Sequence, residues 1–208
     1  MKKIIFLVAA IVILTYTGCQ DTGSGSWEIG AEVYNDSSGN THVLVFIVEG
    51  VDFVSDASVS VNGENVPFSL FAYGGTLLTP VAAGGTANIV IQGSGTSVND
   101  TLTMPAQPII GPNPADGASN AIPVDWTFSG SAEGITVSVS SVYTASPDGY
   151  EATFPAAGGS TTIPDGVVTS GNPTVQVRAY NSTPISGAAS GSTYAVEYLS
   201  EKSFTYTP

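Results

Sequence analysis

The sequence predicts an all-β protein made of two antiparallel sandwiches. Apolar and polar residues alternate in most segments, which is typical of strands with one buried face. Beyond residue 18 the chain has 21 valines against six leucines, and β-branched residues favour the pleated surface of a sheet. A proline-rich stretch near the middle of the chain divides these strands into two groups.

The first group of strands begins at Trp27. From there to Val33 the odd positions are apolar and the even positions are glutamate or glycine, which predicts a half-buried strand. The same alternation recurs in three later pairs of residues: Val59 and Val61, Ile89 and Ile91, and Leu102 and Met104.

A central strand and a hairpin are also predicted within this group. Residues 43–48 are wholly apolar, which indicates a central strand covered on both faces. Asn62 and Gly63 follow the Val59/Val61 strand, and both tolerate the positive φ that a type I′ hairpin turn requires. Pro67 lacks an amide donor, so we expect its strand to lie at a sheet edge or to carry a bulge.

Four prolines interrupt the alternation between Met104 and Gly117. Proline has no backbone donor and a fixed φ, so these residues preclude a central strand or a helix and stiffen the path of the chain. We therefore place the domain boundary close to residue 107, with domains at 27–107 and 108–208. A semi-rigid linker here would project the second domain away from a membrane.

Beyond the boundary the alternation returns. Ile122, Val124, Trp126 and Phe128 share one face, and further strands are predicted at residues 135–139, 175–179, 194–198 and 204–206. About seven short strands separated by Gly, Pro and Asn turns predict a sandwich.

Residues 108–208 resemble fibronectin type III and related bacterial immunoglobulin-like domains. Residues 123–126 resemble the tryptophan-bearing B strand, residues 161–164 the approach to the E–F turn, and residues 174–181 strand F. The first domain resembles, more distantly, the immunoglobulin-type modules of bacterial surface lipoproteins, through residues 57–63. Both resemblances imply antiparallel sandwiches.

The first 18 residues have the features of a signal peptide. Lys2 and Lys3 precede eleven apolar residues, fewer than the roughly 20 that a membrane-spanning helix needs. The run ends at Gly18-Cys19, which resembles a bacterial lipobox and implies a diacylglycerol thioether on Cys19, usually with a further acyl chain such as palmitate. An ordinary cleaved signal peptide and an uncleaved N-terminal anchor are the alternatives.

A lipid on Cys19 would hold the protein on a membrane without a transmembrane helix, because each buried CH₂ contributes about 0.8 kcal/mol. Residues 19–26 then form a flexible Gly/Ser-rich tether. The expected location is the bacterial cell envelope, on the outer membrane or the cell surface.

The charge of the chain excludes some partners. Once residues 1–18 are removed, Arg178 and Lys202 are the remaining basic residues against 17 acidic ones. Nucleic-acid binding is excluded because almost no cations could neutralise phosphates. Membrane attachment must come from the lipid and not from a polybasic patch.

The sequence predicts no catalytic residues. His42 is the sole histidine, so a histidine-based zinc site cannot form, and a Ser-His-Asp triad would have to use it. No nucleophile elbow or phosphate-binding motif is present. We interpret His42 as a solvated residue at the start of the strand that follows it.

Calcium is the metal for which the sequence offers candidate ligands, because loop carboxylates and amides are its usual ligands. Asp52 and Asp56 near Glu49 are the calcium candidates, with Asn113 and Asp116 in the linker. The spacing does not fit an EF-hand, and solvated acidic loops are the favoured interpretation. We predict no other cofactor.

Aromatic residues offer a means of binding carbohydrate. Trp27 and Trp126 both fall on the apolar phase of their strands, which favours packing in the core. The tyrosines that we expect to be exposed are Tyr34, Tyr73, Tyr143, Tyr150 and Tyr180.

Together these observations indicate a non-catalytic, lipid-anchored envelope protein that acts as a surface interaction, adhesion or spacer module. A carbohydrate-binding module, or an accessory subunit of a polysaccharide-processing system, is the alternative. The partner would be an envelope protein or a glycan.

Overall fold

The computed structural model describes residues 27–118, 120–139, 149–169 and 171–207, and every regular element in these ranges is a strand. The predicted all-β class is therefore confirmed. The predicted signal peptide, Cys19 and the predicted tether lie outside the described residues.

The strands form one large sheet and two smaller ones. The nine-stranded sheet has the order β13-β12-β15-β16-β1-β2-β7-β6, with β3 paired to β2. Its strands are β1 (Glu28–Asn35), β2 (Thr41–Glu49), β3 (Asp52–Phe53), β6 (Phe68–Ser69), β7 (Ala72–Thr76), β12 (Gly134–Val139), β13 (Tyr150–Pro155), β15 (Thr174–Pro184) and β16 (Thr193–Ser203).

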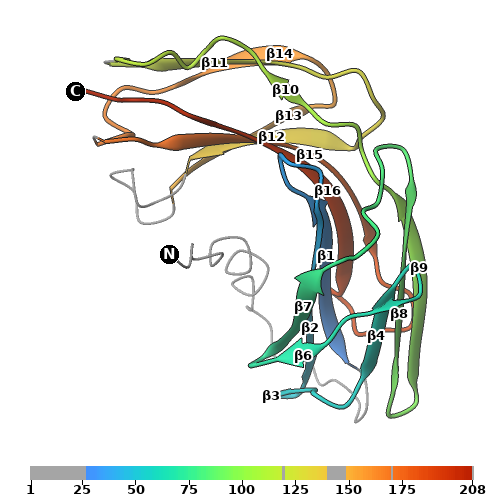
Figure 1. Cartoon of the computed structure of the whole chain (residues 1–208). Helices are drawn as coiled ribbons and strands as arrows, with labels where there is room; N and C mark the ends of the chain where they lie inside the picture. Colours follow the sequence, from blue (N-terminus) through green and yellow to red (C-terminus); the bar gives the residue numbers. More distant parts are fainter. Residues whose placement is uncertain (1–26, 119, 140–148, 170, 208) are drawn as a thin grey trace.

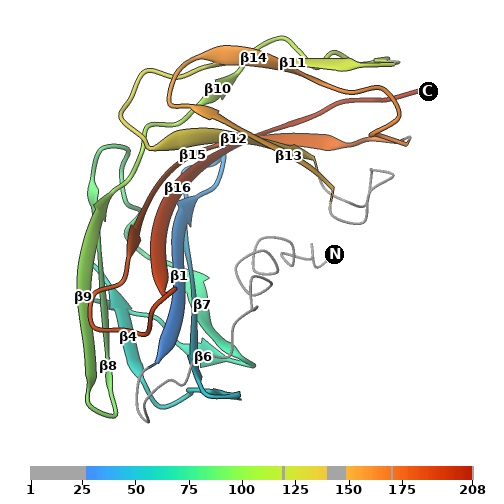
Figure 2. The same cartoon turned by 180° about the vertical axis from the view of Figure 1, so that it is seen from behind.

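Each smaller sheet packs on one part of the large sheet and completes a sandwich. The four-stranded sheet consists of β4 (Ser58–Val61), β5 (Glu64–Asn65), β8 (Thr86–Gly93) and β9 (Thr96–Thr103), and the three-stranded sheet of β10 (Ile109–Ile110), β11 (Ile122–Thr127) and β14 (Gly159–Ile163). Figures 1 and 2 show that the large sheet bends between the two sandwiches, and that both smaller sheets lie on its convex side. The opposite face is concave.

Two hydrophobic cores fill the space between the sheets. The first core contains Trp27 and the alternate apolar residues of β1, β2, β4 and β8. The second contains Trp126 and the alternate apolar residues of β11, β12 and β15. Trp27 is 1% exposed and Trp126 is 3% exposed, which confirms that both tryptophans pack in the core.

The last two strands join the two sandwiches. β15 and β16 pair along eleven residues each, from Thr174↔Ser203 to Pro184↔Thr193. One end of this ladder contributes Val175 and Val177 to the second core, whereas the other end contributes Tyr194 and Val196 to the first. The first core therefore includes residues from beyond the predicted boundary near residue 107.

β1 and β16 pair in parallel, whereas every other pair of named strands is antiparallel. Gly30 lies opposite Thr193, and Asn35 lies opposite Tyr198. The first strand of the fold is thus hydrogen-bonded to the last.

The proline-rich linker lies against β16. Ser200 donates a hydrogen bond to the carbonyl of Pro108, and the Lys202 ammonium donates to the carbonyls of Gly111 and Pro112. These bonds anchor the linker to the same strand that crosses both sandwiches. Together with the continuous β15–β16 ladder, they connect the two sandwiches through hydrogen-bonded backbone.

The local predictions hold in most cases. Asn62 and Gly63 have φ of 50° and 80°, and they join β4 to β5 as the predicted hairpin turn. Pro67 lies between β5 and β6, which are both edge strands.

β2 is central as predicted, but only its core-facing side chains are buried, while Leu44, Phe46 and Val48 are half-buried on the concave face. The prediction that β2 is covered on both faces is therefore wrong.

We predict that the two sandwiches unfold together. Trp27→Phe and Trp126→Phe each leave one tryptophan, which reports on one core. Tyr194 is fully buried and donates a hydrogen bond to the Ala87 carbonyl, so Tyr194→Ala should cost about 3–5 kcal/mol. Because β16 crosses both cores, this substitution should shift both tryptophan-reported denaturation curves equally. A shift confined to the Trp27 signal would contradict the prediction.

Candidate functional site

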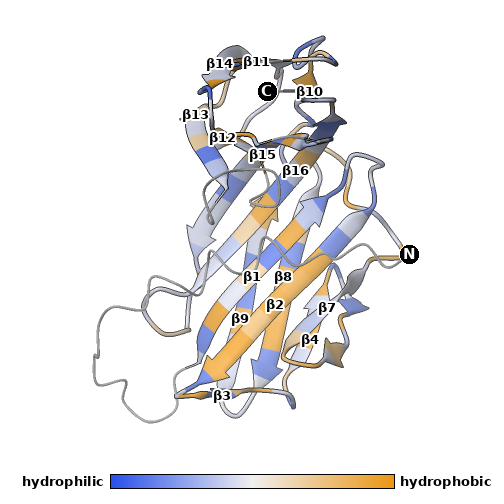
Figure 3. Ribbon diagram, turned by 90° about the vertical axis from the view of Figure 1, so that its left-hand side faces the viewer, coloured by the Kyte–Doolittle hydropathy of each residue, from blue (hydrophilic) through white to orange (hydrophobic). Residues whose placement is uncertain are grey.

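Four side chains form a row across the concave face of the nine-stranded sheet. The pairing register places His42 of β2 beside Tyr34 of β1, Tyr34 beside Glu197 of β16, and Glu197 beside Tyr180 of β15. All four are half-buried, and each points away from the core-facing residues of its strand. We call His42, Tyr34, Glu197 and Tyr180 the concave row. Figure 3 shows the sheet, with β2 largely hydrophobic.

The rings of the concave row are held in place by their neighbours. The Tyr34 and His42 rings are stacked, with centroids 5.0 Å apart and planes at 24°. At the other end Tyr180 lies over Gly134 of β12, its cross-strand partner. A Cβ on Gly134 would come within 2.7 Å of the Tyr180 hydroxyl and 2.9 Å of its ring carbons. The glycine therefore provides the space in which this ring lies against the sheet.

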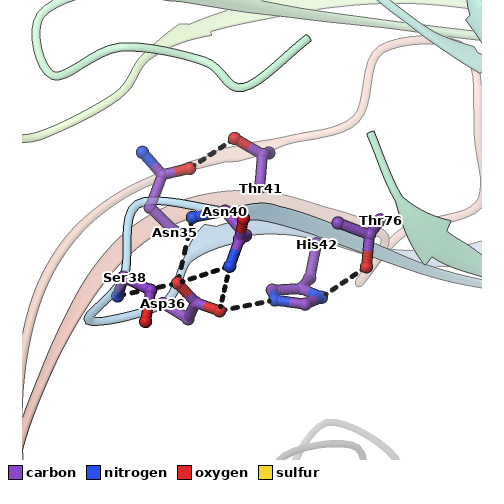
Figure 4. Close-up of polar contacts among 7 residues, drawn as sticks. All are labelled: Asn35, Asp36, Ser38, Asn40, Thr41, His42 and Thr76. Atoms are coloured by element: carbon purple, nitrogen blue, oxygen red, sulfur yellow. Dashed lines mark hydrogen bonds and ion pairs between the residues drawn. The ribbon is translucent and has the colours of Figure 1, made fainter. Parts of the chain in front are cut away.

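His42 is fixed by hydrogen bonds on both ring nitrogens (Figure 4). Its Nε2 lies 3.0 Å from Asp36 Oδ2, and its Nδ1 lies 3.0 Å from Thr76 Oγ1. The prediction that His42 starts a strand is confirmed, but the side chain is held in a network and is not simply solvated. These contacts set the orientation of the ring on which Tyr34 stacks.

Asp36 also stabilises the β1–β2 turn. Its Oδ1 accepts hydrogen bonds from the backbone amides of Ser38 and Asn40, each 2.9 Å long. Partial burial raises the pKa of Asp36, but hydrogen bonds from His42, Asn40 and Ser38 outweigh this effect and lower the pKa to about 2. The carboxylate is therefore charged at neutral pH.

The order Thr76–His42–Asp36 is that of a hydrolase triad, but its surroundings are those of a structural network. Thr76 is an exposed residue at the end of β7, and it pairs with His42 across the sheet. We assign the network to positioning His42.

A buried polar network lies beneath the same turn. Asn35 Nδ2 donates to the Val81 carbonyl at 2.7 Å, and Thr41 Oγ1 donates to Asn35 Oδ1 at 2.6 Å. The Val81 amide in turn donates to Thr41 Oγ1 at 2.7 Å. Buried polar groups with complete hydrogen bonding rigidify their surroundings. The sequence offered no signal for this network, because its partners lie about 40 residues apart.

Charged residues surround the concave row. Arg178, the sole arginine of the chain, lies 3.8 Å from Glu197 and donates to Gln176 at 2.6 Å. Burial and the neighbouring Glu197 raise the pKa of Glu32 to about 8, although Arg178 opposes this effect. Burial also raises the pKa of Glu197, which Arg178 partly lowers. A proton is thus retained on this carboxyl cluster near neutral pH.

The predicted exposure of the tyrosines is partly correct. Tyr34, Tyr150 and Tyr180 are half-buried, and Tyr143 lies outside the described residues. Tyr73 is only 2% exposed and packs edge-on against Phe68, with ring centroids 5.1 Å apart, so its predicted exposure is wrong. The reason is register, because Tyr73 lies opposite the buried Val45 and points into the first core.

The predicted calcium residues are exposed loop or edge residues. Asp52 lies in β3, and Asp56 follows it before β4. Within the ranges that the structure describes, no group of three or more His, Cys, Asp or Glu side chains is arranged to hold a metal ion. Solvated acidic loops stay the favoured interpretation of Asp52 and Asp56, with calcium binding as the alternative.

The described part of the chain contains no helix long and apolar enough to cross a membrane.

The sequence matches no family model and no curated protein. Among solved structures, the chain is similar to the BSP domain of a biofilm-associated protein, with 18% identity, a TM-score of 0.28, and coverage of 86% of this chain and 30% of that one. It thus spans less than a third of that protein's chain.

The chain is also similar to the fibronectin(III)-like modules of Clostridium thermocellum CbhA. The identity is 12% and the TM-score is 0.24, with 86% of this chain and 94% of that chain covered.

We predict that Glu32 makes stability depend on pH between about 5 and 8. An unperturbed glutamate has a pKa of 4.5, whereas the pKa of Glu32 in the folded protein is about 8. As pH rises, the unfolded chain therefore loses the Glu32 proton before the folded chain does. Its contribution is therefore largest below pH 4.5 and is lost as pH rises towards 8. Each unit of pKa difference is worth about 1.4 kcal/mol.

Glu32→Gln cannot lose this proton, so the variant should gain stability relative to wild type as pH rises over this interval. Urea denaturation at several pH values measures the effect. Gln92→Ala, an exposed residue on the outer face of β8, is the control and should follow the wild-type profile. Parallel pH profiles for Glu32→Gln and wild type would contradict the assignment.

Proposed function

We propose that this protein is a non-catalytic, lipid-anchored protein of the bacterial envelope that acts as a surface interaction or adhesion module. The proposed binding surface is the concave face of the nine-stranded sheet. The lipobox-like Gly18-Cys19 and the tether after it support the anchored location. The proposed partners are an envelope protein or a glycan.

The observation that carries the proposal is the concave row on a sheet that cannot flex freely between its two halves. The β15–β16 ladder runs from one sandwich into the other, so the curvature of the face is built into hydrogen-bonded strands. A preformed surface avoids the entropy cost of ordering flexible segments on binding. Tyrosine side chains add contact area at low conformational cost.

A glycan is favoured over a protein partner by the arrangement of the rings. Tyr34 stacks on His42, and Tyr180 lies over Gly134, so flat rings are found at both ends of the row. Sugar rings pack their C–H faces on aromatic rings, while their hydroxyls hydrogen-bond to carboxylates and amides. Glu197, Arg178 and Gln176 lie between or beside the rings and provide such groups.

A glycan array with the lipid-free chain that begins at Gln20 tests this function, followed by titration of each bound glycan. Tyr34→Ala and Tyr180→Ala should each weaken binding about 5- to 30-fold, the effect of losing 1–2 kcal/mol. Gly134→Ala should also weaken binding because its Cβ displaces the Tyr180 ring. Gln92→Ala should bind as wild type does.

Adhesion of cells that display the full chain distinguishes a glycan from a protein partner. If the array is silent but adhesion is lost in Tyr34→Ala and Tyr180→Ala, the partner is a protein. Adhesion and glycan binding that both survive these substitutions would overturn the concave face as the binding surface.

The anchor has its own test. Radiolabelled palmitate should enter the wild-type protein but not Cys19→Ala. Equal labelling of both proteins would contradict lipidation of Cys19.

A further inference from the structure

Four large apolar residues are exposed together at one end of the first sandwich. Val51 is 92% exposed, Leu70 78%, Phe71 53% and Phe53 46%. The Phe53 and Phe71 rings contact each other, with centroids 5.9 Å apart. We call these four residues the apolar tip. Clustered exposed apolar residues on a soluble domain mark interaction sites.

The apolar tip is formed by two adjacent hairpins. Val51 and Phe53 belong to the β2–β3 hairpin, in which Glu49 pairs with Asp52. Leu70 and Phe71 form the two-residue turn between β6 and β7. Figure 1 shows β3 and β6 at the end of the molecule farthest from β10, β11 and β14. The apolar tip is therefore the extremity of the first sandwich.

The backbone at Leu70 is strained. Its φ is +61°, in the left-handed region that a branched side chain rarely adopts. In a two-residue hairpin turn, the first central position with positive φ usually holds glycine. A leucine here carries a conformational cost, and its side chain is 78% exposed, so it gains little from the core. Strain that persists at an exposed site indicates a functional constraint.

The fold starts at the same end as the apolar tip. Glu28 of β1 pairs with Val48, and Val48 pairs with Phe53 of β3. Two strand spacings, about 10 Å, therefore separate the start of β1 from the tip. The segment from Cys19 to Trp27 spans at most about 30 Å when extended. A lipid on Cys19 would thus keep the apolar tip close to the bilayer.

We propose that the apolar tip contacts the surface of the bilayer that holds the Cys19 anchor. This inference rests on the proposed lipidation of Cys19. The tether raises the local concentration of the tip at the bilayer, so even a weak contact is populated. Phe53 and Phe71 enter the interfacial region, and the first sandwich stands on the membrane with the second sandwich away from it.

The charges near the tip identify the kind of bilayer surface. Glu49 and Asp52 are exposed residues beside Val51, and Asp56 is exposed near Phe53. These carboxylates would be repelled by anionic headgroups. The contact is therefore with zwitterionic lipid, and it should weaken as the anionic fraction rises.

Site-specific fluorescence on the lipidated full-length protein in phosphatidylcholine vesicles tests the proposal. Cys19 is the sole cysteine, and lipidation converts its sulfur to a thioether, so an introduced cysteine is the one free thiol. An environment-sensitive dye is attached at Val51→Cys or, as the matched control, at Leu78→Cys. Leu78 is 90% exposed, follows β7 and lies outside the tip.

A lipid-borne quencher should reduce the fluorescence at position 51 at least twofold more than at position 78. Leu70→Gly keeps the turn and relieves its strain, and it should lower the quenching at position 51 although the protein stays folded. Phe71→Ser should do the same. Replacing half of the phosphatidylcholine with phosphatidylglycerol should also lower the quenching.

Equal quenching at positions 51 and 78 would overturn the membrane contact. Concentration-dependent cross-linking through position 51 without quenching would also overturn it, because the tip would then join two copies of the chain. A failed anchor is recognised separately. Without lipidation Cys19 keeps a free thiol, and each variant binds two dyes instead of one.

Discussion

The continuous pairing of β15 with β16 is the constraint on which the rest of the structure depends. Each strand begins in one sandwich and ends in the other, so the two cores share a hydrogen-bonded backbone. The linker between the cores is bonded to β16 as well. The bend of the large sheet follows from this arrangement, since two sandwiches are packed on the same side of a single sheet.

Placing both cores on one side leaves the other side of the sheet to polar and aromatic residues and to the apolar side chains of β2, Leu44, Phe46 and Val48. The concave face carries the sole arginine of a strongly acidic chain, and burial together with the neighbouring Glu197 raises the pKa of Glu32 to about 8. Structural residues support this face from behind, as the Asn35–Thr41–Val81 network does for the turn beside His42. This support comes from buried residues on the core side of the sheet.

Local patterns predicted the strands well because burial follows the two-residue period of the backbone. This period predicted the burial of Trp27 and Trp126, and the tolerance of Asn62 and Gly63 for positive φ predicted their turn. The register of the strands could not be predicted from the sequence, because it depends on pairing between residues far apart in the chain. The concave row needs four strands in alignment, and the inward side chain of Tyr73 follows from its pairing with Val45. Likewise, no local pattern shows that residues 185–196 complete the first core.

The parallel pairing of β1 with β16 has a consequence for the order in which the fold assembles. The amide of Ile29 donates a hydrogen bond to the hydroxyl of Ser192. Residues 163 positions apart must therefore meet before the hydrogen bonds of β1 are complete. Such non-local contacts form slowly. During synthesis the leading part of the polypeptide lacks its closing strand, so the large sheet is completed only after β16 has been made.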